Sequence, residues 1–388
     1  RLRSLLGELT EAAGGSAAGG ADAADELREY WAERLETQRE LLLRSYENFF
    51  KEDPLDVVDY HLRQVLLANM WHISEYKHVL DGTDGEQLLR PLTTDVSAAL
   101  SKLRLEVLAH GNVVPKEARE MAEVITSSFV GEGASEPLPD AELPRNSVVL
   151  LPPEPEGATV FEFDLEAVNP VEENSAISNL YQVGPVGEDL RRDASLYVLA
   201  HLADHSAFEQ LRTKEQLGYV ASAGLHRFYG VDGLMVSVQG PRLPPAGLDA
   251  RIEAWLARFR GEVEAMSAEA FAQNVDALVH VRSQRDKKLA QEVGRHWEEI
   301  VKRTYRFDRL KAEVAALREV TRGDVLALFD RHLAMGGELR RKLSSRVTGA
   351  AARKSRAETP ATSEKVRVLR TLEEVRNFKQ ALPTHSEG

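Results

Sequence analysis

The pattern that most restricts the fold of this chain lies in residues 218–240. "GYVASAGLHR" and "DGLMVSVQG" are rich in residues that favour strands, and only "FYGV" separates them. So short a connection joins two strands as an antiparallel hairpin, whereas a parallel pair needs a crossover of a dozen or more residues. The chain is therefore expected to contain an antiparallel sheet.

Strand and helix patterns alternate around this hairpin. Three further segments have strand character, and the last of them would close the sheet: 158–166, 175–183 and 338–347. A helix is expected from about residue 188 to the hairpin, and a helical block over 248–333. Within that block Thr321 and Asp324 have the spacing of a capping box. This order predicts an α+β fold, in which mainly antiparallel sheets are covered by helices.

The length of 388 residues exceeds one ordinary hydrophobic core and predicts two domains. We expect a first domain over 1–130 and a second over 151–388, joined by a Gly- and Pro-rich linker over 131–150. In the first domain the Ala/Gly-rich residues 10–26 are expected to form a flexible insertion, and residues 103–114 a strand that ends in a turn.

Composition limits the possible partners. The net charge of −13 argues against nucleic-acid binding, and no apolar run is long enough to cross a membrane. Cysteine is absent, which excludes disulfides and thiol catalysis. Because the chain opens on Arg1, we expect it to be a fragment, so its compartment stays open with the cytoplasm as the default.

Two histidine clusters are candidate metal ligands. "HLADH" places His201 and His205 four residues apart on a helix, with Asp204 where the H-x-x-E-H zinc motif has Glu. No Glu occurs in the downstream segment "ALVHVRSQRDKK" to act as a third ligand, so surface histidines are the favoured interpretation. His72 and His78, which flank Glu75, point to different sides of a helix and are expected to be solvated or interdomain residues.

The next segment, "LRTKEQLGY", ends a helix and enters a strand through Gly218. Arg212 offers planar donors and Tyr219 a hydroxyl, which together can polarise a peptide carbonyl. The alternative is a surface pair of Arg212 with Glu209 or Glu215, and a tyrosine packed under the sheet. Chemistry alone favours this alternative.

Several separated segments resemble one peptidase family. They are "FEQLRTKEQLGYV", "YGVDGLMVSVQG", "RSYENFFKEDPLDVVDYHLRQVLL", "LRLEVLAHGNV", "SAEAFAQNVDALVHVRSQRDKKLAQEVGRHWEEI" and "VRNFKQALP". Together they span about residues 40–383 and resemble the third and fourth domains of the insulysin branch of the pitrilysin-type zinc peptidases. The resemblance implies four related α+β domains in two halves, which enclose a chamber where peptides are cut.

This resemblance assigns roles by motif position. The zinc site is implied to lie in an N-terminal half that is absent here. This fragment is therefore expected to bind no metal and to be inactive alone. A metal site at His201 and His205 is the minority alternative. Arg212 and Tyr219 are implied to contact the substrate and the transition state. The implied partners are peptide substrates and the N-terminal half or a related subunit, and the first domain is implied to lack its first strands.

Two questions of function remain open at this stage. Arg285, Lys287 and Lys288 match a basic run in the family and are a possible site for an anion or polyphosphate, although a solvated helix face is the favoured interpretation. The main hypothesis is a chamber-forming, substrate-positioning half of a zinc metalloendopeptidase. The alternative is a catalytically inactive structural or peptide-binding subunit of the same fold.

Overall fold

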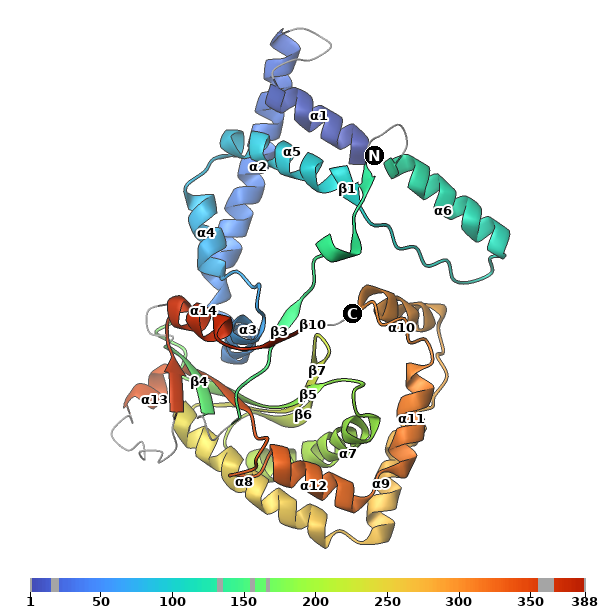
Figure 1. Ribbon diagram of the computed structural model, residues 1–388. Helices are drawn as coiled ribbons and strands as arrows, with labels where there is room; N and C mark the ends of the chain where they lie inside the picture. The colour runs from blue at the N-terminus through green and yellow to red at the C-terminus, as the bar shows by residue number, and fades with distance from the viewer. Residues whose placement is uncertain are drawn as a thin grey trace. The chain divides into compact units, whose positions relative to one another are not determined.

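The computed structural model describes residues 2–14, 21–130, 135–153, 158–164, 168–354 and 366–386. The chain divides into two compact units, each made of several segments: unit 1 is Arg1–Phe49, Trp71–Pro144 and Lys288–Ile300, and unit 2 is Phe50–Met70, Arg145–Lys287 and Val301–Gly388. Figure 1 shows the elements of both units. The domain boundaries and linker expected from the sequence stay a prediction.

Unit 1 is mainly helical in the residues that the structure describes. Its elements are α1 (Leu2–Gly14), α2 (Ala21–Phe49), α4 (Ile73–Asp81), α5 (Gly85–Ser101), β1 (Lys102–Leu103), α6 (Pro115–Val130), β2 (Glu136–Pro137), the short 3-10 helix η2 (Asp140–Glu142) and most of α10 (Leu289–Val301). β1 and β2 form a two-residue parallel pair.

Two local predictions in this unit were wrong. Of the Ala/Gly-rich residues 10–26, those up to Gly14 continue α1 and those from Ala21 begin α2, because alanine favours helix; residues 15–20 lie outside the described residues. The strand predicted over 103–114 is reduced to Lys102–Leu103. Its partner is only two residues long and includes Pro137, which has no amide hydrogen to extend the pairing.

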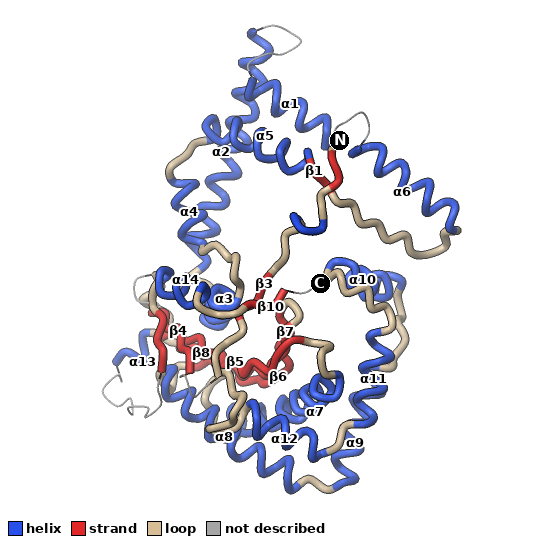
Figure 2. Tube along the Cα trace, in the orientation of Figure 1, coloured by secondary structure: helices blue, strands red, loops and turns tan. Residues whose placement is uncertain are grey.

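Unit 2 contains a six-stranded sheet in the order β6-β7-β5-β8-β4-β9, red in Figure 2. Its strands are β4 (Ala158–Asp164), β5 (Ser175–Pro185), β6 (Val220–Phe228), β7 (Val231–Gly240), β8 (Lys342–Thr348) and β9 (Val366–Leu369). The strands from β6 to β8 are antiparallel neighbours, while β4 runs parallel to β8 and β9. The α+β class is confirmed, and β3 (Ser147–Val149) pairs separately with β10 (Thr384–Ser386).

The predicted hairpin is confirmed as β6 and β7. Phe228 lies opposite Val231, and the two residues between them, Tyr229 and Gly230, have φ of 41° and 78°. Positive φ at both central residues is the mark of the hairpin turn that matches the twist of its strands. The strand predicted over 338–347 also forms, as β8, but it lies between β5 and β4 and does not close the sheet at an edge.

Helices cover both faces of this sheet (Figure 1). The helices of unit 2 are α3 (Pro54–Leu66), α7 (Leu190–Ala207), the π-helix η5 (Phe208–Lys214), α8 (Pro245–Ala265), α9 (Ala268–Arg282), α11 (Arg309–Glu319), α12 (Arg322–His332), α13 (Ala350–Lys354) and α14 (Leu372–Gln380). α7, α8 and α12 pack on one face, where Trp255 and Phe259 are buried, and α3 and α14 on the other, where Leu62 and Phe378 are buried. The predicted capping box of Thr321 and Asp324 is confirmed at the start of α12.

A buried ionic network joins α8 to the sheet. Lys342 Nζ lies 2.8 Å from Asp249 Oδ1 and 2.6 Å from Glu253 Oε1. Arg346 Nη2 lies 2.7 Å from Asp249 Oδ2, and Arg340 Nη2 lies 2.6 Å from Glu253 Oε1. Burial alone would raise the pKa of both carboxyls, but the adjacent cations outweigh it and lower the pKa of each. Lys342 is therefore the cation shared by both carboxylates.

None of the helices in the described ranges is both long and apolar enough to cross a membrane.

Replacement of Lys342 by Met is expected to destabilise unit 2 by about 3 kcal/mol, because it leaves two buried carboxylates without their shared cation. Native-state hydrogen exchange of the β8 and α8 amides measures this effect within the unit. Lys311→Met, at an exposed lysine of α11, is the matched control and is expected to change the exchange little. Equal exchange in the two variants would contradict the role of the network.

The stabilisation by Asp249 and Glu253 is expected to decrease with acid. Because their folded-state pKa values lie below the ordinary values of 3.8 and 4.5, their contribution is complete above pH 4.5 and is lost as the pH falls through the lower folded values. The difference in unfolding free energy between the wild type and Lys342→Met should therefore shrink below pH 4.5. A difference that stays constant between pH 7 and pH 3 would contradict this expectation.

Candidate functional site

The segment "LRTKEQLGY" connects α7 to β6 through an irregular backbone. α7 passes directly into the π-helix Phe208–Lys214, and Gln216 follows with φ of 53°. π-helical turns and left-handed non-glycine residues are uncommon, and both occur preferentially at functional sites.

Glycine is required at position 218 because this segment passes very close to the backbone of β7. A Cβ atom at Gly218 would lie 1.8 Å from the backbone oxygen of Gln239 and 2.8 Å from the Cα atom of Gly240. A Cβ atom at Gly240 would in turn lie 2.3 Å from the backbone oxygen of Leu217. The two backbones are in direct contact, which fixes the position of Tyr219 at the start of β6.

The guanidinium group of Arg212 lies close to two aromatic rings. Its Cζ atom is 4.7 Å from the ring centre of Phe208 and 4.9 Å from that of Tyr219. Both rings are exposed, Tyr219 by 83% and Phe208 by 44% of its surface. The structure therefore brings the two predicted residues together and adds Phe208 to them. Cation–π contacts of this kind are worth about 0.5–1 kcal/mol at exposed sites, enough to restrict the orientation of the arginine.

The sequence analysis missed Phe208. The signal was present, because residues four apart on a helix face the same way and Phe208 precedes Arg212 by four.

The alternative of a surface ion pair for Arg212 is wrong. Glu209 pairs with Lys214 at 2.7 Å, and Glu215 pairs with Arg251 at 2.5 Å. Burial raises the pKa of Glu215, but hydrogen bonds from Arg251 and Gln210 outweigh it and lower the pKa, so this carboxylate is charged and engaged elsewhere. Within the described ranges no carboxylate lies within 4.0 Å of the Arg212 guanidinium, and Tyr219 is not packed under the sheet.

This arrangement has a defined chemical capacity. The Arg212 guanidinium offers N–H donors that no described carboxylate occupies, and the adjacent Tyr219 offers an exposed hydroxyl. Two such donors can bind a peptide carbonyl oxygen and stabilise the negative charge that develops on it during attack.

The histidines of "HLADH" do not fit a metal site. His201, Asp204 and His205 are exposed on α7. In the part of the chain that the structure describes, no three His, Asp or Glu side chains are grouped so as to hold a metal ion. With Asp in place of Glu and no third ligand nearby, these residues match the expectation of surface histidines.

The second histidine cluster has a structural role. The Nδ1 atom of His72 accepts a hydrogen bond from the backbone N–H of Ser74, and the Glu75 carboxylate accepts one from the backbone N–H of His72 at 2.7 Å. Burial lowers the pKa of His72, which keeps the ring neutral and able to accept. His72 and Glu75 therefore form the capping box that begins α4.

The basic run is exposed but is not placed as one site. Arg285 and Lys287 belong to unit 2 and Lys288 to unit 1, and all three side chains are exposed. Their binding of an anion stays a prediction.

Comparison with known proteins identifies relatives. The family model described as "PQQ synthase PqqF-like, C-terminal lobe domain 4" matches residues 198–297. The chain is 31% identical over 314 residues to the insulin-degrading enzyme of Homo sapiens, a match that covers 81% of this chain and 30% of that protein. It is 28% identical over 359 residues to the peroxisomal insulin-degrading enzyme-like 1 of Arabidopsis thaliana, covering 91% of this chain and 35% of that protein.

Solved structures agree on the fold. The chain is similar to the crystal structure of pitrilysin with a TM-score of 0.74 at 19% identity, over 92% of this chain and 35% of that one. It is also similar to a peptidase M16 inactive domain from Pseudomonas fluorescens, with a TM-score of 0.52 at 15% identity, over 82% of this chain and 71% of that one. The chain spans about a third of the length of the curated relatives described above.

Replacement of Gly218 by Ala is expected to destabilise the junction of β6 and β7 by about 1–3 kcal/mol, because the added methyl group overlaps the backbone of Gln239. Gly224→Ala in the middle of β6, where an added Cβ atom meets nothing within 4 Å, is the control. Hydrogen exchange of the β6 and β7 amides measures both variants. If Gly218→Ala were as stable as Gly224→Ala, the close backbone contact would not exist.

Proposed function

This chain is a homologue of the insulin-degrading enzymes, and from that homology we propose that it is the chamber-forming, substrate-positioning C-terminal half of an insulysin-like zinc metalloendopeptidase. The observation that carries the proposal is the position of Arg212 beside Tyr219, with no carboxylate partner in the described residues. A structural subunit has no need to keep a half-buried arginine free of the acidic residues near it in the chain, Glu209 and Glu215.

Arg212 and Tyr219 are proposed to contact the substrate at the bond that is cut. Both offer N–H or O–H donors on a rigid junction, and Phe208 and Gly218 hold that junction in place. Donors fixed before the reaction stabilise the developing oxyanion without reorganisation, so their contribution should appear in the rate of cleavage more than in substrate binding.

The zinc ion is proposed to be bound elsewhere. Among the described residues no three His, Asp or Glu side chains are grouped to hold a metal ion, and "HLADH" has Asp204 where the zinc motif has Glu. The proposal therefore places the metal in an N-terminal half of the same protein or in a related subunit, and residues 1–130 and 151–388 would be the third and fourth domains of the assembly. Peptides small enough to enter the chamber would be its substrates.

In the protein that contains both halves, Arg212→Gln is expected to lower kcat/KM for peptide cleavage by about 10²–10³-fold, because it removes the charged donor at the developing oxyanion. Tyr219→Phe removes one hydroxyl and should lower kcat/KM with little change in KM. Hydrolysis of a quenched fluorescent peptide measures both effects.

Lys214→Gln is the matched control, because Lys214 lies on the same π-helix and its pair with Glu209 is exposed. It is expected to leave kcat/KM nearly unchanged. If Arg212→Gln and Tyr219→Phe behaved like this control, the assigned roles would be wrong. If the assembled protein cleaved no peptide at all, the inactive structural or peptide-binding subunit would be the better description.

A further inference from the structure

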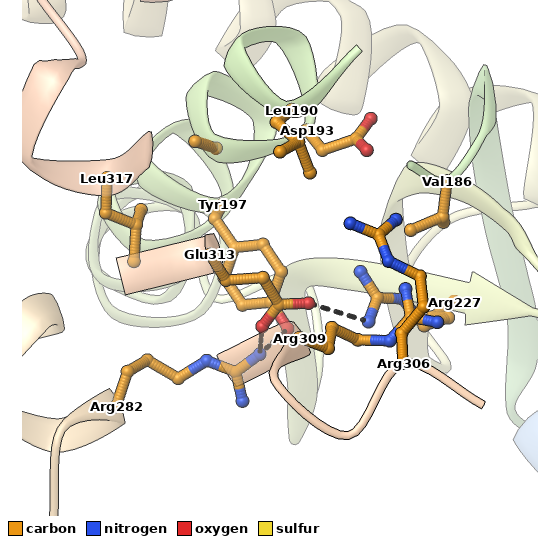
Figure 3. Close-up of a pocket in the computed structure, with 11 residues that line it drawn as sticks. Val186, Leu190, Asp193, Tyr197, Arg227, Arg282, Arg306, Arg309, Glu313 and Leu317 are labelled. Atoms are coloured by element: carbon orange, nitrogen blue, oxygen red, sulfur yellow. Dashed lines mark hydrogen bonds and ion pairs between the residues drawn. The ribbon is translucent and has the colours of Figure 1, made fainter. Parts of the chain in front are cut away.

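Two pockets of unit 2 differ in the room that they leave for a ligand. The pocket shown in Figure 3, between α7 and α11, holds about 20 Å³, and Glu313 in it pairs with Arg282 at 2.7 Å and with Arg227 at 3.7 Å. A second cavity, between α8 and the segment from α12 to β8, measures about 590 Å³ and is partly open to solvent. Pockets that bind small molecules commonly measure about 300–1,000 Å³, so only the second of these two, the α8 cavity, has room for a ligand.

The walls of the α8 cavity are mainly apolar. α8 contributes four alanines, spaced by three or four residues and therefore on one face of the helix: Ala246, Ala250, Ala254 and Ala257. On the side of α12, which lies next to α8 in Figure 1, Phe329 and Leu333 are buried, and Met335 at the mouth is 63% exposed. Small side chains along the helix leave the space open, and apolar groups of a ligand would leave water when they enter it.

The charged part of the α8 cavity contains groups of both signs. Asp249, Glu253, Lys342 and Arg346 line it, and all four belong to the buried ionic network that joins α8 to the sheet. Asp249 is 8% and Lys342 5% exposed, so these groups are fixed in position by the fold. A ligand would meet them already oriented.

Two atoms of this network have no partner among the described residues. Oε1 of Glu253 accepts three hydrogen bonds, of which those from Arg340 and Lys342 are 2.6 Å long, whereas Oε2 accepts none. Arg346 donates to Asp249 through Nη2 at 2.7 Å, whereas its Nη1 atom donates to no described residue. Neither atom is sealed from solvent. Both are therefore available to a ligand in the cavity.

The two free atoms carry opposite charges and lie close together. Burial raises the pKa of Glu253, but the charges of Lys342 and Arg340 outweigh it and lower the pKa, so this carboxyl is ionised, while a guanidinium group is always charged. Arg346 pairs with Asp249, and Glu253 follows Asp249 by four residues, which places the free atoms roughly 5 Å, one helical turn, apart.

This arrangement favours a ligand that carries both charges. A cation at Glu253 would lie near the guanidinium of Arg346, and an anion at Arg346 would lie near the carboxylate of Glu253, so a ligand with one charge meets repulsion as well as attraction. A zwitterion meets both groups favourably. In a peptide with free ends the ammonium and carboxylate groups are separated by about 3.3 Å for each extended residue, so the spacing fits a peptide of about two residues.

We propose that the α8 cavity binds a short peptide, of about two residues, that has free ends and apolar side chains. Its ammonium group binds Oε2 of Glu253, its carboxylate binds Nη1 of Arg346, and its side chains lie against the alanines of α8 and Met335. The site goes beyond the proposed peptidase function and does not depend on it, because binding at the cavity is measured without peptide cleavage.

Calorimetric titration of the purified chain with the dipeptide Leu-Leu tests the proposal and should show saturable binding of one peptide per chain. N-acetyl-Leu-Leu lacks the ammonium group and Leu-Leu-amide lacks the carboxylate. Each should bind about tenfold more weakly than Leu-Leu, because each loses one charge-assisted hydrogen bond. Gly-Gly keeps both ends but has no side chains, so it should bind at least about tenfold more weakly as well.

Arg346→Lys tests the carboxylate contact, because lysine keeps a charge beside Asp249 but has no second terminal nitrogen. It is expected to weaken the binding of Leu-Leu by about tenfold and to leave that of Leu-Leu-amide unchanged. Glu253→Gln should in the same way weaken the binding of Leu-Leu and leave that of N-acetyl-Leu-Leu unchanged. A purely structural role for either residue would not depend on which end of the peptide is capped.

Ala254→Leu tests the apolar wall and leaves the ionic network intact, which keeps the proposal testable if the network variants do not fold. Ala254 is exposed and lines the cavity, so a leucine there should occupy the space and weaken the binding of Leu-Leu by about tenfold or more. Ala265→Leu, at an exposed alanine of α8 outside the cavity, is the matched control and should leave binding unchanged.

Several results would overturn the proposal. Without saturable binding of Leu-Leu, the charged groups would form only a self-contained ionic network. Equal affinities for Leu-Leu and the two capped peptides would remove the role of Glu253 and Arg346. If Ala254→Leu bound Leu-Leu as well as Ala265→Leu does, the peptide would bind elsewhere. If free leucine bound as tightly as Leu-Leu, the ligand would be an amino acid and the assigned length would be wrong.

Discussion

The contact between two backbones at Gly218 and Gly240 is the constraint on which the candidate site depends. With no side chain on either residue, the segment that leaves α7 lies directly against the end of β7 and enters β6 beside it. The chain changes direction at the π-helix and at Gln216, which has a left-handed backbone conformation. Arg212 and Tyr219 are seven residues apart in sequence, and only this path brings the guanidinium over the ring. The path of the backbone therefore determines where the two side chains of the candidate site lie.

Much of the fold could be predicted from the sequence, because its signals are local. The hairpin of β6 and β7 and the capping box of Thr321 follow from residues close together in the chain. The position of β8 does not, since strand pattern alone carries no information on which neighbours a strand takes or in which direction. The strand expected after Leu103 failed for the same reason: strand propensity gives a strand only where a partner is available.

The candidate site, like the fold, was only partly predictable from the sequence. The residue types at Arg212 and Tyr219 were readable from the motif, and the four-residue spacing of Phe208 and Arg212 was a signal that was not used. The contact of Arg212 with Tyr219 was not readable, because it depends on the π-helix and on the left-handed Gln216. His201 and His205 are exposed, as the sequence analysis expected. "HLADH" has nearly the spacing of a zinc motif, yet its His and Asp side chains are exposed on α7. His72, which was expected to be solvated or to lie between domains, is buried and caps α4. Spacing identifies a possible ligand pair and says nothing about the third group that a metal needs.

The arginines of unit 2 fall into two classes by their carboxylate partners. Arg227, Arg340 and Arg346 each have a buried or half-buried acid at hydrogen-bond distance, and these pairs hold elements of the fold together. Acidic residues outnumber basic ones in this chain, so an arginine side chain that meets aromatic rings in place of an acid is unusual. Arg212 is such a residue. A guanidinium group is always charged. An arginine that has no carboxylate partner therefore keeps its N–H donors available for a ligand. At Arg212 the proposed ligand is a peptide carbonyl oxygen, which becomes negative during the reaction.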